Sequence, residues 1–96
     1  MNRQILEAPI RDIIQNIPPG HSFDSHEIIR QLLRGHSEEY FRFIASFDQE
    51  VLTTETVHGH VGQIIASMEN VVVQKNMAFS SNIHGKPSPC HSFVKR

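Results

Sequence analysis

The stretch VGQIIASMENVVVQK, residues 61–75, changes its hydrophobic pattern halfway and thereby decides the fold class. Up to Glu69 the apolar residues recur every three or four positions, which is the spacing of one face of an α-helix. After Glu69 the chain is β-branched and short, and a second strand-like segment, CHSFVK, follows at residues 90–95. Between them lies the turn-rich segment SSNIHGKPSP, residues 80–89. This switch predicts an α+β fold that ends in an antiparallel β-hairpin with a long polar tip.

Upstream of the switch, the same helical periodicity predicts four helices. Their expected ranges are residues 9–16, 24–35, 37–47 and 53–69. Asp24 and Thr53 are suitable N-cap residues for the second and fourth helices. Because a proline inside a helix removes one backbone hydrogen bond, we expect the first helix to begin at Pro9, with at most a separate turn before it.

The apolar faces of these helices predict one shared core. The inward residues expected on the helix of residues 53–69 are Val57, Val61, Ile64, Ile65 and Met68. Ile28 and Leu32, on the helix of residues 24–35, are expected to lie in that core. The inward residues expected on the helix of residues 37–47 are Tyr40, Phe41, Ile44 and Phe47.

Length and composition predict a single folded domain over residues 1–96, since 39% of the residues are hydrophobic and 20% are charged. The only cysteine, Cys90, cannot form an internal disulfide, which is typical of a reducing compartment. No apolar run approaches the ~20 residues that span a bilayer, and the N-terminus lacks the apolar core of a signal peptide. We therefore expect a cytoplasmic protein that does not enter a membrane.

The charges are sorted along the chain. A formal net charge of -1 argues against a surface designed throughout for phosphates. Residues 43–74 contain no Lys or Arg, however, and every formal charge after Glu69 is positive. These late charges are Lys75, Lys86, Lys95 and Arg96. An anionic partner is therefore expected to dock at the C-terminal segment.

The order of elements, a helix, a short extended piece, further helices and then a hairpin, resembles the winged helix-turn-helix superfamily. The tail NIHGKPSPC, residues 82–90, is also similar to the ends of small bacterial proteins of this layout. The resemblance implies that residues 21–23 form a short strand at the hairpin edge, that residues 53–69 form the recognition-type helix, and that residues 80–89 form the wing. The chain departs from the family at residues 37–47, where an extra helix replaces a tight turn.

This resemblance and the charge sorting together predict a transcriptional regulator that binds double-stranded DNA mainly through its wing, as a dimer. The expected contacts on the C-terminal hairpin that contains the wing are Lys75, Asn76, His84 and Lys86. The recognition-type helix adds only neutral hydrogen-bonding groups from His58 and Gln63. The alternative for the same elements is a winged-helix module that binds proteins and no nucleic acid.

Simpler interpretations stand beside this one. The helix of residues 53–69 can serve only to close the core, and the wing lysines can serve only to keep an edge hairpin soluble. The outward positions expected on that helix include Gly59 and Gly62. Two glycines in a helix interior predict the close approach of another part of the fold or of a partner.

Neither a metal, a cofactor nor catalysis is expected from the motifs. The possible metal ligands among the histidines and the cysteine are His58, His60, His84, Cys90 and His91. The two on the helix are two residues apart and point in different directions, and the chain has no Cys-x-x-Cys pair. Cys90 and His91 are neighbours in a predicted strand, so their side chains leave opposite faces and make no catalytic dyad. Cys90 is expected to be a small buried hydrophobe.

Overall fold

The computed structural model describes residues 1–48 and 52–96, and within them the chain forms four α-helices and five β-strands. The elements are, in order, α1 (Gln4–Gln15), β1 (Ser22–Asp24), α2 (Ser25–Gly35), α3 (Ser37–Ala45), α4 (Thr54–Ala66), β2 (Val72–Gln74), β3 (Ala78–Ser81), β4 (Pro87–Cys90) and β5 (Ser92–Lys95). The predicted α+β class with four helices is confirmed. The N-caps expected at the second and fourth helices are confirmed as well, since the Asp24 side chain accepts the N–H of Glu27 and the Thr53 side chain accepts that of Thr56.

The strands form two antiparallel sheets, in which β2 to β5 make one long hairpin and β1 adds to its edge. In the first, β5 is the central strand of a three-stranded sheet in the order β1-β5-β2. Phe23 of β1 lies opposite Phe93 of β5, with the two rings stacked at a centroid distance of 5.6 Å. The short strand expected at the hairpin edge is therefore present. Further out, β3 and β4 pair with each other, so the predicted polar tip is itself regular on both sides of a turn at Gly85, whose φ is +75°.

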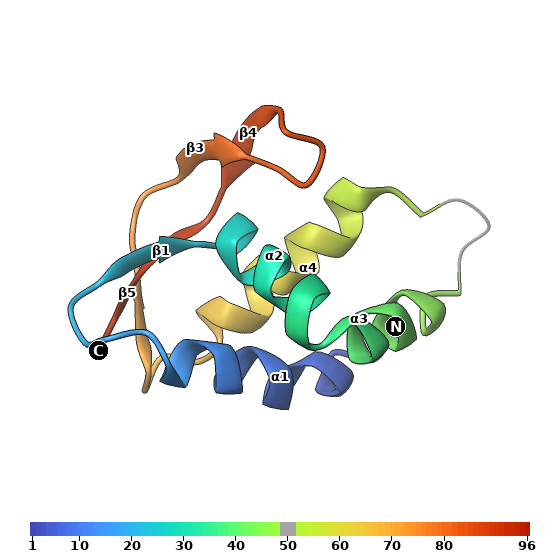
Figure 1. Ribbon diagram of the computed structural model, residues 1–96, viewed down its shortest axis with the longest axis horizontal. Helices are drawn as coiled ribbons and strands as arrows, with labels where there is room; N and C mark the ends of the chain where they lie inside the picture. The colour runs from blue at the N-terminus through green and yellow to red at the C-terminus, as the bar shows by residue number, and fades with distance from the viewer. Residues whose placement is uncertain (49–51) are drawn as a thin grey trace.

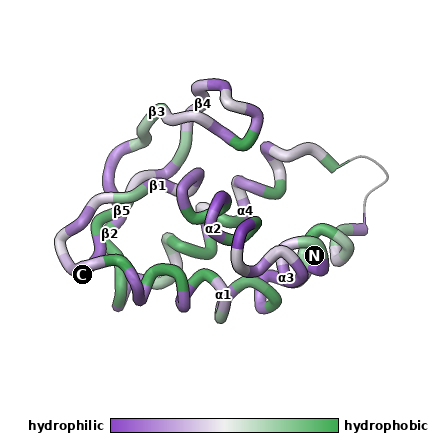
Figure 2. Tube along the Cα trace, in the orientation of Figure 1, coloured by the Kyte–Doolittle hydropathy of each residue, from purple (hydrophilic) through white to green (hydrophobic). Residues whose placement is uncertain are grey.

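The helices and the hairpin enclose one hydrophobic core. Figure 1 shows α1 along one side of the molecule, α2 and α4 crossing above it, and the β3–β4 ladder arching over the beginnings of α2 and α4. Figure 2 shows that the hydrophobic positions of the helices face the interior. The core residues predicted for α4 are all at most 4% exposed, and Ile28 and Leu32 belong to the same cluster.

The first helix is longer than predicted, because α1 begins at Gln4 and continues through Pro9. The proline lacks the N–H that would bond within the helix. Leu6, before the proline, and Ile10, after it, are both fully buried. Continuing the helix across Pro9 places these two side chains on one face, and their burial compensates for the missing hydrogen bond.

The face of α3 also differs from the prediction. Phe41 was expected inside but is 60% exposed, whereas Phe43 is fully buried. Tyr40, Phe43, Ile44 and Phe47 follow the three- and four-residue spacing of a single face, and Phe41 lies outside it. Phe43 also contacts Phe47 edge to face, with ring centroids 5.1 Å apart.

Candidate functional site

A cleft of about 240 Å³ lies where the beginnings of α2 and α4 meet the β3–β4 ladder. It is the candidate site because it adjoins both elements that the sequence nominated for partner contact. Its titratable lining residues are His26, Glu55, His58, His84, Cys90 and His91. A larger groove of about 630 Å³ runs between α1 and α2, and the one ion pair found among the described residues, His36 with Asp12 at 3.3 Å, lies there.

Small side chains let the hairpin approach α2. In the β3–β4 register Ala78 lies opposite Cys90 and Ser80 lies opposite Ser88, so these four side chains share the inner face of the ladder. His26, which is 5% exposed, is hydrogen-bonded through Nδ1 to Ser80 Oγ (2.8 Å) and through Nε2 to Ser88 Oγ (3.3 Å). The inner face of the hairpin is thus held to the first turn of α2.

A second contact holds the tip of the hairpin. Arg30 Nη1 of α2 donates a hydrogen bond to the backbone carbonyl of Ser81 at 2.8 Å. The side chain of Asn82 accepts the backbone N–H groups of His84 and Lys86, which closes the turn. The tip is therefore anchored to the helices on one side and closed by its own asparagine on the other.

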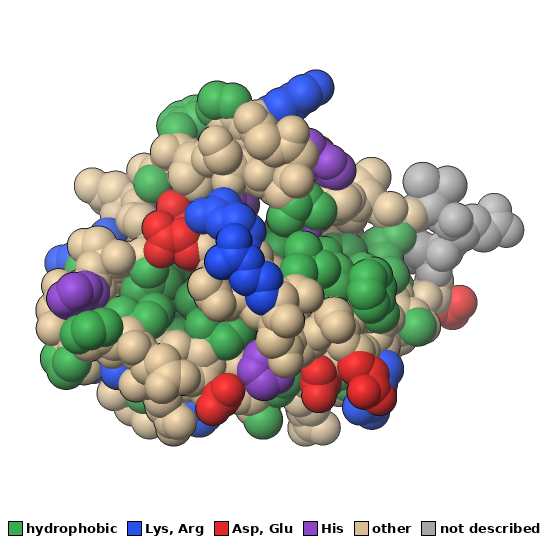
Figure 3. Space-filling model, viewed as in Figure 1, with side chains coloured by type: hydrophobic (Ala, Val, Ile, Leu, Met, Phe, Trp, Pro, Cys, Tyr) green, Lys and Arg blue, Asp and Glu red, His purple; other side chains and the backbone are tan. Residues whose placement is uncertain are grey.

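The outer face of the hairpin is apolar and exposed. Phe79 is 76% exposed and lies across from Pro89, and Met77, which precedes β3 and also lines the cleft, is 56% exposed. Figure 3 shows hydrophobic side chains along the top of the molecule, with a Lys or Arg side chain at the hairpin tip. Lys75 and Lys86 are both exposed, and neither forms an ion pair within the described part of the chain. The hairpin consequently presents two cations beside an apolar surface.

The remaining predicted contacts on the hairpin, Asn76 and His84, are exposed as expected. The backbone carbonyl of Asn76 accepts a hydrogen bond from Ser92 Oγ, which leaves its side-chain amide at the surface. The last two cations of the chain are used internally. Lys95 Nζ donates to the carbonyl of Ile17 (3.0 Å) and Arg96 Nε donates to the carbonyl of Glu69 (2.6 Å).

His58 on α4 is half-buried, whereas the sequence placed it on the outward face. Its Nε2 is hydrogen-bonded to the hydroxyl of Tyr40 at 3.1 Å. Burial is the main cause that lowers the pKa of His58 from 6.5 to about 4; the neighbouring imidazoles of His26 and His84 act in the same direction, and the Glu55 carboxylate opposes them. The imidazole is therefore neutral in the native protein near neutral pH.

The lowered pKa of His58 makes stability depend on pH. The unfolded chain takes up a proton on this side chain as the pH falls below about 6.5, while the native chain does so only near 4. Between these values the unfolded state binds more protons, so acid favours unfolding. The stabilising contribution of neutral His58 is present above the unfolded pKa and is lost as the pH falls through this window.

Gln63 is exposed on α4, but its amide is already engaged. Arg3, at the start of α1, donates from Nη2 to Gln63 Oε1 and is also hydrogen-bonded to His60 Nδ1 at 2.8 Å. Burial and the Arg3 charge lower the pKa of His60. The helix that contains no cation of its own thus receives one from the N-terminal segment, which no local pattern in the sequence indicated.

The two glycines of α4 have different surroundings. Gly62 was expected on the outward face but is buried, because the His91 ring packs directly against it. A Cβ at this position would lie 2.5 Å from His91 Cδ2. A Cβ at Gly59 would meet nothing within 4 Å. The close approach predicted from the pair therefore occurs within the fold, at Gly62 alone.

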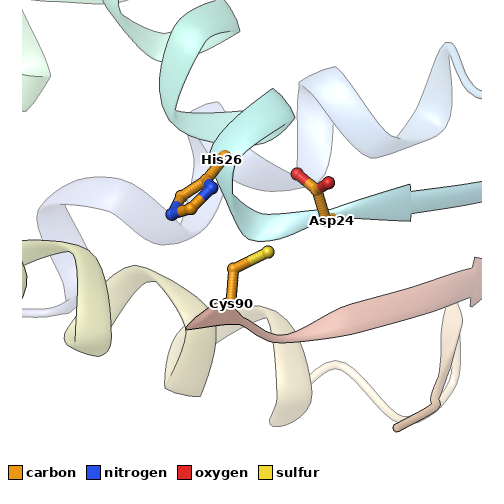
Figure 4. A group of neighbouring side chains, drawn as sticks. All are labelled: Asp24, His26 and Cys90. Carbon is orange, nitrogen blue, oxygen red and sulfur yellow. The ribbon is translucent and has the colours of Figure 1, made fainter. Parts of the chain in front are cut away.

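The structure also assembles a group that the sequence motifs did not suggest. Asp24, at the end of β1, and His26, in the first turn of α2, lie beside Cys90 at the end of β4 (Figure 4). One potential ligand atom from each lies within 4.8 Å of the other two. Cys90 is 4% exposed, so the expectation of a small buried side chain is confirmed. The contact between these distant segments depends on how the hairpin folds over α2, so spacing along the sequence could not reveal it.

None of the helices in residues 1–48 and 52–96 combines the length and apolarity needed to cross a bilayer. The chain matches no family model, no curated protein and no solved structure.

Proposed function

We propose that this protein is a small cytoplasmic winged-helix regulator that binds double-stranded DNA, with the hairpin leading the contact. The observation that carries the proposal is the exposure of Lys75 and Lys86 on one hairpin, without an ion pair to either in the described residues. Phosphates attract unpaired cations, and these two lie on an element that projects from the helices.

The surface of α4 supports a secondary role for the helix. The helix contains no Lys or Arg, and the exposed Glu55 in its first turn repels phosphates. The two neutral groups expected to read bases are held by Tyr40 and Arg3. Their use in base recognition would require breaking these hydrogen bonds, whereas the side chains of Lys75 and Lys86 are ready to bind.

The hairpin combines features that suit a minor groove. Proteins that bind there use Lys, Arg and Asn beside exposed apolar side chains that contact the base steps. Lys75, Asn76 and Lys86 supply the polar groups, and Met77 and Phe79 supply the apolar ones. Because two phosphate contacts give only weak binding, we propose that a dimer presents two hairpins.

The test is a titration of random duplex DNA at low and moderate salt. Each lysine that neutralises a phosphate contributes about 0.9 to the slope of log affinity against log salt. Replacing Lys75 and Lys86 together by Ala should therefore flatten the slope by nearly two units. The matched control is Arg34→Ala with Arg42→Ala, which removes the same charge from exposed positions on other elements. That control should leave the slope unchanged.

Two results would contradict the proposal. One is the absence of salt-sensitive binding in the unaltered protein. The other is a salt slope that flattens when Arg34 and Arg42 are replaced and stays unchanged when Lys75 and Lys86 are replaced. Gln63→Ala should at most relax sequence preference without changing the slope, because its amide does not neutralise a phosphate.

The alternative is a protein-interaction module, and the exposed apolar face of the hairpin favours it specifically. Phe79 is 76% exposed on the outer face, and Met77, which precedes β3 and also lines the cleft, is 56% exposed. We propose a second copy of this chain as the occupant in that case, with the two hairpins packed face to face. Sedimentation should then show a dimer that Phe79→Ser disrupts, while Phe41→Ser, at an exposed phenylalanine on α3, does not. If the dimer is lost in Phe79→Ser, and replacing Lys75 and Lys86 leaves DNA binding unchanged, the protein-interaction proposal replaces the DNA proposal.

A further inference from the structure

We propose that Asp24, His26 and Cys90 form a binding site for a divalent transition metal of the zinc class, at the junction of α2 and β4 (Figure 4). The observation that carries it is the convergence of three different donors, a carboxylate oxygen, an imidazole nitrogen and a thiol sulfur, all within 4.8 Å of one another. His26 and Cys90 are buried, and Asp24 is half-buried. The site is independent of DNA binding, since it uses none of the exposed hairpin lysines.

The donor types select the metal. Thiolate and imidazole ligands favour zinc and its neighbours in the transition series, whereas calcium and magnesium take all-oxygen sites. An ionised Asp24, a Cys90 thiolate and a neutral His26 together supply two negative charges. These charges balance a divalent cation and also offset the partial positive charge at the start of α2.

The separations are suitable for a site that closes on binding. Bonds of about 2.0–2.3 Å to a tetrahedral zinc place neighbouring donor atoms about 3.3–3.5 Å apart. Donors as far apart as 4.8 Å must therefore approach by up to about 1.5 Å, which side-chain rotation can supply. Asp24 Oδ1 already accepts the backbone N–H of Glu27 at 2.9 Å, so Oδ2 is the oxygen left for the metal.

An outer set of hydrogen bonds already orients the imidazole. Metal-bound histidines usually bond through their second ring nitrogen to a partner that holds the ring in place. Ser80 Oγ contacts His26 Nδ1 at 2.8 Å, and Ser88 Oγ contacts Nε2 at 3.3 Å. Whichever nitrogen binds the metal, the other retains a serine partner. Without metal, Ser80 also contacts Cys90 Sγ at 3.5 Å, so the same groups can form a purely structural hydrogen-bond chain.

The cleft gives a metal ion access to the site and leaves room for a fourth ligand. His26 and Cys90 both line it, so a cation can enter from solvent, and a water molecule can complete a four-coordinate site. Binding requires the Cys90 thiol to lose its proton to solvent, so metal affinity should rise with pH. Because the ligands come from α2 and β4 and their flanks, the metal would link the hairpin to the helices.

The test is a titration of the reduced protein with Co²⁺, followed by displacement with Zn²⁺. The expected result is one metal per chain, a thiolate-to-cobalt charge-transfer band, and visible d–d absorption bands with the high intensity of tetrahedral Co²⁺. Cys90→Ser should remove the charge-transfer band. His26→Gln should lower affinity by more than about 100-fold, the upper end of the effect of losing an outer-set partner.

Two further variants keep the test independent of folding defects. The double variant Ser80→Ala with Ser88→Ala removes the outer hydrogen-bond partner of the imidazole whichever nitrogen binds the metal, and should lower affinity by about 10- to 100-fold. His84→Gln alters an exposed histidine of the same cleft that is not among the three ligands, and should leave affinity unchanged. Circular dichroism of each protein checks that it is folded. The proposal is overturned if the unaltered protein shows no charge-transfer band, if Cys90→Ser retains it, or if affinity follows His84 instead of His26.

Discussion

Replacing each of the two glycines of α4 by Ala, and comparing the stabilities of the two variants, measures how closely the hairpin packs on this helix. Both are helical, and both would gain the same intrinsic stability from replacement by Ala. They differ in their neighbours, because a Cβ at Gly62 would lie 2.5 Å from His91 Cδ2 and 3.3 Å from Cγ, whereas a Cβ at Gly59 is unobstructed. The first of these distances is too short for a carbon–carbon contact.

The magnitudes follow from two opposing effects. Ala in place of Gly in a helix interior stabilises by up to about 1 kcal/mol. Gly59→Ala should keep this gain. At Gly62 the His91 ring must move, and overpacking of this kind costs about 1–3 kcal/mol. Gly62→Ala should therefore have a free energy of unfolding about 1–3 kcal/mol below that of Gly59→Ala.

Urea unfolding followed by circular dichroism measures both variants. A double-mutant cycle with His91→Ala then isolates the contact, since without the ring Gly62→Ala should regain most of the helical stabilisation. Gln74 Nε2 donates a hydrogen bond to His91 Nδ1, and this bond is absent from both His91→Ala proteins, so its loss cancels in the cycle. Equal stability of Gly59→Ala and Gly62→Ala would refute the reasoning, because the hairpin would then not pack against α4 at His91.

Three further predictions concern pH, the core and the hairpin. The pKa shift of His58 from 6.5 to about 4 corresponds to about 3 kcal/mol, which its partial exposure reduces to about 1–2 kcal/mol. Unfolding curves should show this loss between those pH values, and His58→Gln should flatten the profile whereas His84→Gln should not. Leu32→Ala or Ile64→Ala should lower the free energy of unfolding by about 2–5 kcal/mol, against almost no change for the exposed Gln31→Ala, and an unmoved urea midpoint would contradict the assigned core. Arg30→Met removes the bond to the Ser81 carbonyl, so amide exchange should accelerate in β3 and β4 but not in β5, and unchanged exchange would show that this contact does not hold the tip.

The sequence by itself determined the features that depend on neighbouring residues. An α-helix repeats every 3.6 residues, so the spacing of Val57, Val61 and Ile64 was enough to predict the buried face of α4. The side chain of Asp24 caps a backbone N–H only three residues away, so that helix start was also readable. The switch to β-branched residues after Glu69 predicted the hairpin, because strand preference also depends on residues that are neighbours in the sequence.

The tertiary structure decided everything that depends on which segments meet. Pro9 lies within a continuous helix because Leu6 has a buried site to occupy, which no pattern within the helix reveals. Arg3 reaches α4, His91 covers Gly62, and Cys90 joins Asp24 and His26, in each case between residues far apart in sequence. Such contacts are set by the angle at which packed elements cross and by how far the hairpin folds back. These quantities result from filling the whole core at once, so no single stretch of the chain specifies them.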